Sequence, residues 1–464
     1  MVEKKAEKAS VWTSYSKDDK EKLEALAAGY IDFISNCKTE RECAAEVVRE
    51  AEAAGYRNLS DVLKAGEKLK AGDKVYAVNM KKAVVLFNIG TEPLQEGINI
   101  LGAHIDSPSL HLKQNPLYEE GGLSYLDTHY YGGIKKYQWV TLPLAMHGVV
   151  VKKDGTVVDI SIGEKKTDPV FCVTDLLIHL AQEQMEKKAS KAVEGENLDI
   201  LIGSYPLKDG EKESVKAGIL KLLKDTYDIE EDDFLSAEII LVPAGRAREL
   251  GFDRSMVIGY GQDDRVCAYT SLRAMLDTKA VKRTACCLLV DKEEIGSVGA
   301  TGMRSRFFEN TCAELLSAAE QYSELALRHM LARSKMLSSD VSSAFDVLYQ
   351  SAFDKKNTAY CGRGMVFNKF TGHGGKSGSN DANAEYLGEL RHIMDKHTVH
   401  FQLAELGRVD LGGGGTIAYI MSLYGMQVID SGVAVLSMHA PWEVTSKIDI
   451  YEANKGYRAF LAEA

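Results

Sequence analysis

The hydrophobic positions of the chain follow two different periods, which predict both helices and buried strands. Between residues 18 and 54, apolar side chains recur at helical spacing and predict two consecutive helices, and similar spacing predicts one long helix at 310–331. Continuous apolar runs at 98–102, 284–290 and 434–438 predict buried strands. Strands that alternate with helices are typical of a mixed, mostly parallel sheet covered by helices on both faces. The sequence therefore predicts an α/β fold.

The pattern changes between residues 113 and 245. Short β-like pieces such as 148–151 alternate with glycine turns, and a strongly charged stretch follows at 187–224. These features predict a separate β-rich unit with some helix, inserted into a larger α/β body. The body then consists of residues 1–112 and 246–464.

The composition narrows the classes of partner and compartment. A chain of 464 residues is long enough for two domains with separate cores. The formal net charge of −11 argues against nucleic acid or an anionic membrane as a partner, and no apolar run approaches the ~20 residues of a membrane span. None of the eight cysteines forms a Cys-x-x-Cys pair, and the charged N-terminus does not resemble a signal peptide. We therefore expect a cytoplasmic protein with reduced thiols.

Charged or imidazole groups follow four apolar runs, at the points where strands are predicted to end. His104 and His439 each follow one run, the pair Glu293-Glu294 follows another, and Asp340 follows a weaker one. The functional crevice of an open α/β sheet lies outside the carboxyl ends of its strands. We therefore expect these side chains to meet in one place.

Further acids lie beside these positions. Asp106 comes two residues after His104 on the same side of an extended chain, so it can accept a hydrogen bond from the imidazole of a metal-bound His104. A plain stabilising pair of the two side chains is the alternative. Asp263 precedes a predicted helix at 265–276 and can bridge two cations, whereas Asp264 is favoured as the cap of that helix.

Together these side chains have the composition of a catalytic metal site. Two histidines and three acids can act as ligands, which leaves a glutamate, Glu293, as a base: the ligands are His104, Asp263, Glu294, Asp340 and His439. Nitrogen and oxygen ligands without thiolate suit Zn²⁺, Mn²⁺ or Co²⁺. A bridging carboxylate would place two ions ~3.5–4 Å apart, as in two-metal hydrolases. The alternative for the glutamate pair is a solvated position at the end of a strand.

The motifs around these residues resemble those of the M18 metalloaminopeptidases, the family of aminopeptidase I and aspartyl aminopeptidase, and in particular its bacterial members. The matching segments spread over almost the whole chain in the family's order, at 102–110, 262–265, 291–297, 339–340, 376–380 and 437–441. As a set these motifs are highly specific, although no single one is. The resemblance implies a fold of the zinc-peptidase type.

The resemblance also implies a role for each metal ligand. His104 and Asp340 would hold one ion. Glu294 and His439 would hold the other, and Asp263 would bridge the two. Two divalent ions per subunit are therefore expected, Zn²⁺ first, with Mn²⁺ or Co²⁺ as alternatives.

The remaining implications concern catalysis and assembly. Glu293 would be the catalytic base of an enzyme that acts on peptide substrates. In the family, an insertion between the motifs of His104 and Asp263 builds dimers, and six dimers form a dodecamer with an enclosed chamber. The predicted unit at 113–245 lies at that place in the sequence.

Three residues are candidates for substrate contacts. His179, in the apolar stretch 176–180, matches a histidine that reaches a neighbouring subunit's active site in some family members; otherwise it is a plain histidine on a helix. Lys376 can attract a carboxylate or belong to a mobile loop. Gly413, within the glycine run 412–415, can offer backbone N–H groups to a substrate carbonyl or serve only as a tight entry to a helix that begins at Thr416.

Three functions are compatible with these residues. The first is a two-metal aminopeptidase, the second a related carboxypeptidase or N-acyl amino acid amidohydrolase, and the third a non-enzymatic assembly protein with structural metals. The Glu293-Glu294 pair favours an enzyme, because a structural site has no use for a base beside a ligand. Animal aspartyl aminopeptidases carry a histidine shortly after the position of Asp340, whereas this chain has Val-Ser-Ser-Ala at 341–344. That difference leaves the preferred N-terminal residue open.

Overall fold

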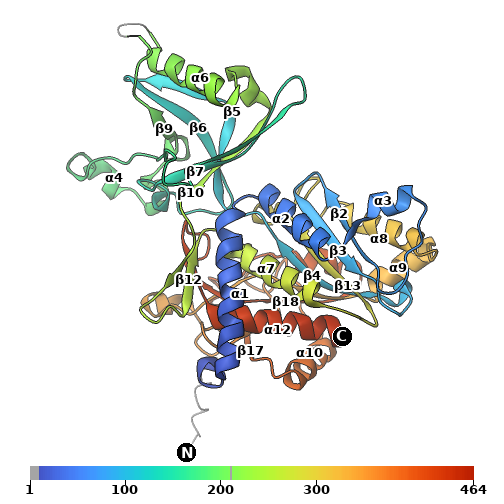
Figure 1. Ribbon diagram of the computed structural model, residues 1–464. Helices are drawn as coiled ribbons and strands as arrows, with labels where there is room; N and C mark the ends of the chain where they lie inside the picture. Colours follow the sequence, from blue (N-terminus) through green and yellow to red (C-terminus); the bar gives the residue numbers. More distant parts are fainter. Residues whose placement is uncertain (1–9, 209–211) are drawn as a thin grey trace, which may run out of the picture. The chain divides into compact units, whose positions relative to one another are not determined.

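The computed structural model describes residues 10–208 and 212–464, which divide into two units (Figure 1). Unit 1 comprises the chain up to Asp106 together with Ala247–Met438 and Glu443–Ala464. Unit 2 comprises Ser107–Arg246 and the short segment His439–Trp442. The segment predicted as an insertion, 113–245, falls within unit 2.

Unit 1 is built on a nine-stranded mixed sheet. Its strands, in spatial order, are β1 (Arg57–Asn58), β2 (Lys74–Asn79), β3 (Ala83–Asn88), β13 (Thr284–Val290), β4 (Ile98–His104), β14 (Lys335–Ser338), β18 (Gln427–Gly432), β16 (Met365–Asn368) and β17 (Phe401–Ala404). The four central strands β13, β4, β14 and β18 run parallel to one another. Their carboxyl ends therefore share one edge of the sheet.

Helices cover both faces of this sheet, because a strand directs successive side chains to opposite sides. In β4, Leu101 and Ala103 belong to one hydrophobic cluster, and Ile98 and Ile100 belong to another. The first cluster contains side chains of α1 (Lys17–Asn36), α2 (Glu40–Ala53), α7 (Gln262–Asp277), α10 (Ala384–Lys396) and α12 (Lys447–Glu463). The second contains side chains of α3 (Leu59–Lys64), α8 (Phe307–Ala318), α9 (Glu324–Ala332) and α11 (Ala418–Ser422). The predicted α/β fold is confirmed.

Capping residues define the two N-terminal helices. Ser16 accepts a hydrogen bond from the Asp19 backbone N–H, and the Asp19 side chain accepts one from Ser16 in return. Thr39 and Glu42 form the same reciprocal arrangement before α2. Such capping boxes satisfy backbone donors that the first turn leaves without partners.

A second sheet of unit 1 carries the C-terminal motif. Its strands, in spatial order, are β11 (Arg248–Leu250), β12 (Met256–Gly259), β20 (Glu443–Ser446), β19 (Ala434–Leu436) and β15 (Ser342–Ser343). β19 and β20 pair antiparallel, with Leu436 opposite Val444. The connection between them, residues 437–442, contains His439.

Unit 2 contains a six-stranded antiparallel sheet. Its strands, in spatial order, are β8 (Val157–Ile162), β7 (Leu144–Val151), β10 (Ala237–Pro243), β5 (Ser109–Glu120), β6 (Leu123–Tyr131) and β9 (Ile200–Gly203). The helices of this unit are α4 (Gln182–Glu186), α5 (Ala189–Ala192) and α6 (Ser214–Tyr227). Within residues 10–208 and 212–464, every helix is too short or too polar to cross a bilayer.

Candidate metal centre

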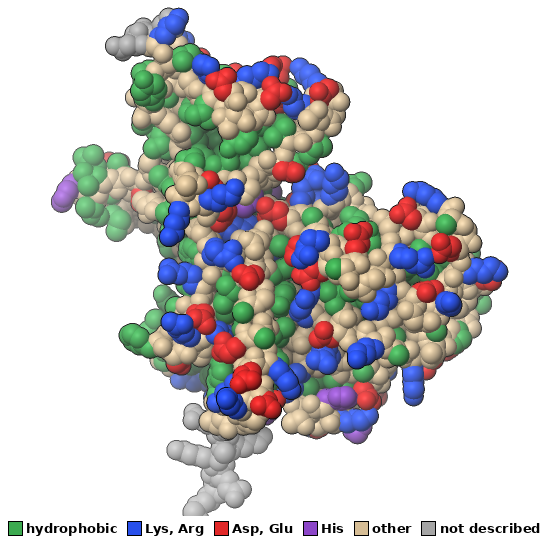
Figure 2. All heavy atoms as spheres, viewed as in Figure 1, with side chains coloured by type: hydrophobic (Ala, Val, Ile, Leu, Met, Phe, Trp, Pro, Cys, Tyr) green, Lys and Arg blue, Asp and Glu red, His purple; other side chains and the backbone are tan. Residues whose placement is uncertain are grey.

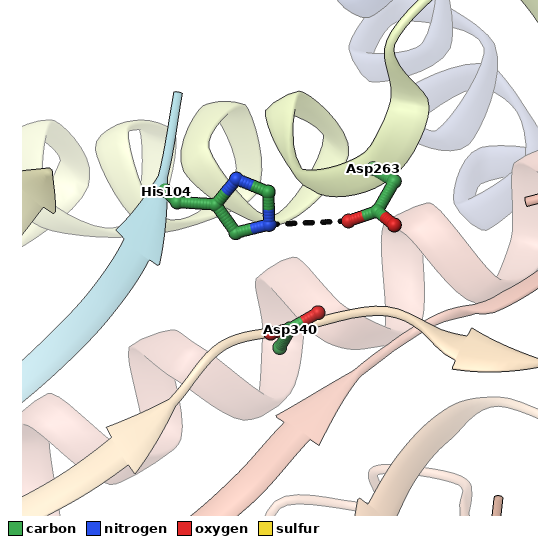
Figure 3. Close-up of side chains that lie close together, drawn as sticks. All are labelled: His104, Asp263 and Asp340. Atoms are coloured by element: carbon green, nitrogen blue, oxygen red, sulfur yellow. Dashed lines mark hydrogen bonds and ion pairs between the residues drawn. The ribbon is translucent and has the colours of Figure 1, made fainter. Parts of the chain in front are cut away.

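Three of the predicted ligands come together at the carboxyl edge of the central strands. His104 is the last residue of β4, Asp340 follows β14 by two residues, and Asp263 lies at the start of α7. β4 and β14 are parallel neighbours, so their ends bring His104 and Asp340 to the same place. Each of the three side chains offers one ligand atom within 4.8 Å of the others, and all three are buried (Figure 3). His104 Nε2 lies 3.1 Å from Asp263 Oδ1.

The backbone at the start of α7 turns Asp263 toward this cluster. Asp263 and Asp264 both have non-helical dihedral angles, and the peptide bond between them is cis.

The predicted capping role of Asp264 is wrong. Its carboxylate is fully buried, the residue before the helix is Gly261, and neither carboxylate oxygen accepts a capping hydrogen bond from a backbone N–H of the first turn.

Asp106 connects the histidine ligand with the glutamate loop. Its Oδ1 lies 3.3 Å from His104 Nδ1, which is the pairing expected from the sequence. The same carboxylate also accepts hydrogen bonds from two successive backbone N–H groups, those of Glu293 at 3.1 Å and Glu294 at 3.2 Å. The backbone carbonyl oxygen of Asp106 also lies 3.1 Å from His104 Nδ1, so this one residue orients His104 and positions the backbone of both glutamates.

The glutamate pair lies in a tight turn directly after β13. Glu293 begins a single 3₁₀ turn that ends at Gly296, whose φ of 89° lies in the left-handed region that glycine tolerates. Glu293 Oε2 lies 3.8 Å from His104 Nε2. Asp263 and Glu294 each offer a carboxylate oxygen within 4.8 Å of the other. The turn thus brings both glutamate side chains to the cluster, although adjacent residues of an extended chain would direct their side chains to opposite sides.

The electrostatics of the cluster follow from the burial of like charges. Burial raises the pKa of Asp340 well above its usual range, and the carboxylates of Asp264 and Asp263 raise it further. For His104, burial by itself lowers the pKa, but hydrogen bonds to the carboxylates of Asp106 and Asp263 outweigh it, so the net shift is upward. A divalent cation relieves repulsion of this kind and prefers nitrogen and oxygen donors without thiolate. The residues present therefore fit such an ion.

His439, the fifth predicted ligand, lies in the connection between β19 and β20 and is counted with unit 2. Its Nδ1 lies 2.9 Å from the carbonyl oxygen of Gly133. A backbone carbonyl at one ring nitrogen fixes the tautomer of a histidine and leaves the other nitrogen as a donor for a metal.

The three predicted substrate residues have different surroundings. His179 is exposed on a single 3₁₀ turn, Ile178–Leu180, in place of a longer apolar helix, and its role toward a neighbouring subunit stays a prediction. Lys376 and Gly413 both line one cavity of about 250 Å³ in unit 1. Lys376 Nζ lies 2.9 Å from Asp381 Oδ2, a residue outside the lining of this cavity.

The glycine run 412–415 uses part of its hydrogen-bonding capacity within the chain. The N–H of Gly412 donates to the carbonyl oxygen of Arg408, and that of Gly414 donates to Thr371. The following helix α11 begins at Ala418, later than expected, and is only five residues long. The run therefore forms a loop of its own before a short helix.

A buried glutamate beside the centre could not be predicted from the sequence. Glu443, the first residue of β20, is 1% exposed, and its carboxylate accepts a hydrogen bond from the Asp263 backbone N–H at 3.1 Å. A single glutamate at the start of a strand carries no signal in the sequence, because only the tertiary fold brings it to Asp263.

Comparisons with known proteins place the whole chain in one family. The family model described as aminopeptidase I zinc metalloprotease (M18) matches residues 33–461. A protein of Clostridium acetobutylicum named probable M18 family aminopeptidase 1 is 63% identical over 455 residues, which cover 97% of each chain. The crystal structure of an M18 family aminopeptidase from Thermotoga maritima has a TM-score of 0.94 and 42% identity, and the match covers 99% of this chain and 100% of that one.

A more distant structure shares the fold. The S. cerevisiae mApe1 dodecamer has a TM-score of 0.76 at 19% identity, and the match covers 95% of this chain and 97% of that one. The chain belongs to the M18 family of zinc metalloaminopeptidases.

Proposed function

We propose that this M18 aminopeptidase removes N-terminal residues from peptides with two divalent metal ions. The observation that carries the proposal is the meeting of His104, Asp263 and Asp340, from three separate elements, with ligand atoms within 4.8 Å of one another. Their nitrogen and oxygen donors suit Zn²⁺, with Mn²⁺ or Co²⁺ as alternatives.

In this proposal the two ions share one aspartate. His104 and Asp340 hold the first ion, and Asp263 bridges it to the second. Glu294 and His439 hold the second ion. The short distance between carboxylate oxygens of Asp263 and Glu294 supports this division. The antiparallel pairing of β19 with β20, both in unit 1, supports the placement of His439, because it restricts the connection that carries this residue.

Glu293 acts as the base in this proposal. Bound divalent ions lower the pKa of a coordinated water and polarise the scissile carbonyl. The Glu293 carboxylate takes a proton from the attacking water and then donates it to the leaving amine. Its position supports this role, because Oε2 lies 3.8 Å from His104 Nε2 while the backbone N–H is held by Asp106. The carboxylates of the centre hold the free α-amine of the substrate, which accounts for cleavage at the N-terminus.

The adjacent glutamates allow a sharp test of these roles. Glu293→Gln should keep both ions, as measured by elemental analysis, while kcat on an aminoacyl anilide falls by roughly 10²–10⁴-fold, since a general base is lost. Glu294→Gln is the matched control, because it removes a ligand one residue away and should lower metal content together with activity. Full activity in the Glu293 variant would rule out the base role, and unchanged metal content in the Glu294 variant would rule out the ligand role.

We also propose that unit 2 mediates self-association, up to a dodecamer built from dimers. An apolar arm in this unit, defined here as residues 170–185, supports the proposal. Six of its large hydrophobic side chains are between 51% and 70% exposed: Val170, Leu176, Leu177, Ile178, Leu180 and Met185. Hydrophobic side chains gather around α4, which begins within this arm (Figures 1 and 2). Exposed apolar patches of this kind mark protein interfaces.

A cytoplasmic location of the protein stays a prediction.

A further inference from the structure

We propose that Glu443 is a positioning residue. It fixes the position of the bridging aspartate Asp263 and of the loop 437–442, which contains His439. The inference rests on the proposed two-metal function, because it assigns Glu443 a role toward two of the proposed ligands. Glu443 is not a predicted ligand, and it acts through the backbone of its neighbours.

The first observation is the hydrogen bond between Glu443 and Asp263. Glu443 Oε2 accepts the Asp263 backbone N–H at 3.1 Å, and both residues are buried, at 1% and 4% exposure. The backbone of Asp263 is not helical, with φ −83° and ψ 104°, so the hydrogen-bonding pattern of α7 does not position it. The hydrogen bond to the Glu443 carboxylate instead fixes the backbone of Asp263, whose side chain is the proposed bridging ligand.

A second contact holds Glu443 itself. The fully buried Gln262 donates from Nε2 to the carbonyl oxygen of Glu443 and to that of Val257 at 3.1 Å. The hydroxyl of Tyr30, on α1, donates to Gln262 Oε1 at 3.1 Å. The start of α7 and the start of β20 are therefore joined reciprocally: Gln262 binds the Glu443 backbone, and Glu443 binds the Asp263 backbone. A buried network with its members satisfied fixes one local geometry.

The position of Glu443 in the sequence extends this role to the second ion. Glu443 is the first residue of β20, and the connection 437–442 that contains His439 ends directly before it. A shift of Glu443 would therefore move the end of that connection as well as the backbone of Asp263. One carboxylate thus constrains the bridging ligand and the anchor of the His439 loop.

A purely structural role predicts a different pattern of effects. If the network only joined α7 to β20, loss of the Glu443 carboxylate would lower stability but leave the metal affinity of the folded protein unchanged. If it positions Asp263, the folded protein should bind metal more weakly, because the bridging carboxylate is no longer held at the cluster. Partners behind the ligands typically contribute 10–100-fold to metal affinity.

The test compares metal binding by full-length wild type, Glu443→Ala and Glu443→Gln. Each protein is stripped with chelator, checked for folding by circular dichroism, and titrated with Zn²⁺ against a chromophoric competitor. Refilling with Co²⁺ then gives the absorption spectrum of the bound ions. We expect Glu443→Ala to lose roughly 10–100-fold in affinity for at least one ion and to show a changed Co²⁺ spectrum. Glu443→Gln should recover most of the loss, since its amide oxygen can accept the Asp263 N–H.

Glu452→Ala is the matched control. Glu452 is also a buried glutamate that accepts a backbone N–H, that of His400 at 2.7 Å, but it lies on α12 and touches none of the proposed ligands. This variant should lose stability and keep wild-type metal affinity.

The outcomes separate the inference from the proposed function. Wild-type affinity and spectrum in folded Glu443→Ala would overturn the positioning role, as would a Glu443→Gln variant as weak as the alanine variant. If the wild-type protein binds no ion tightly, the proposed two-metal function itself fails.

Discussion

At the scale of single residues, Asp430 shows how burial outweighs hydrogen bonding. It lies on β18, fully enclosed, and its Oδ1 accepts hydrogen bonds from Ser338 Oγ at 3.2 Å and Thr416 Oγ1 at 2.6 Å. Burial raises the pKa of Asp430 to about 7, although both hydrogen bonds lower it. In the unfolded chain the same carboxyl has an ordinary pKa of about 3.9.

This difference predicts how stability depends on pH. Between pH ~4 and ~7 the native state binds the Asp430 proton more tightly than the unfolded state, so the free energy of unfolding falls as pH rises, by at most about 4 kcal/mol. Asp430→Asn removes the titrating group and should lose this part of the dependence. Urea unfolding of wild type and Asp430→Asn at pH 5 and pH 8, with chelator present, measures the free energy of unfolding of both proteins. An unchanged pH dependence in the variant would contradict the prediction.

Residue chemistry also shows how much of the centre could be predicted. The pairing of His104 with Asp106 follows from alternation along an extended chain, and the structure has it. The hydrogen bonds from the backbone N–H groups of Glu293 and Glu294 to Asp106 could not be predicted, because the direction of these N–H groups depends on the turn after β13. Side-chain types indicate the chemistry of a site, whereas backbone donors become visible only in the fold.

At the scale of elements, continuous hydrophobic runs were the most reliable signal. The run at 284–290 is β13 itself, and the run at 98–102 lies within β4, because strands buried on both faces have no polar side to interrupt them. The expectation that functional groups follow such strands predicted that His104 and Asp340 lie close together, which they do, and Asp263 joins them from the start of α7. Parallel neighbouring strands end at the same edge of the sheet, so residues that follow such strands in the sequence are expected to lie close together in the fold.

Boundaries inside helical regions were less predictable. The expected helix at 310–331 is two helices, α8 and α9, because Glu320 has a φ of 56° and Ser323 caps a new helix through the Ala326 N–H. Helical spacing of apolar residues continues across the break, since both helices pack on the same hydrophobic cluster. Periodicity therefore reports the buried face and not the continuity of the backbone.

At the scale of the whole molecule, the proposed assembly depends on the apolar arm of unit 2. An exposed group of large hydrophobic side chains costs free energy in water, at roughly 25 cal/mol for each Å² left uncovered, and burial against another copy recovers it. The mixed Lys, Arg, Asp and Glu side chains on the visible face of unit 1 offer no comparable patch there (Figure 2).

Charged substitutions in the arm test this dependence. Ile178→Asp combined with Leu180→Asp should reduce the mass measured by light scattering, because carboxylates would have to be buried without partners at the interface. Leu325→Asp is the control, since Leu325 is similarly exposed, at 62%, but lies on α9 in unit 1. An unchanged mass for the double variant would exclude the arm as the interface.

The most direct measurement of the proposed mechanism is the number of divalent ions that the enzyme needs. Metal-free protein is titrated with Zn²⁺ while bound metal per chain and hydrolysis of an aminoacyl anilide are followed together. Two ions per chain are expected, with full activity only when the second is bound, and an N-acetylated substrate should remain uncleaved. Full activity with a single ion per chain, or with none, would contradict the two-metal mechanism.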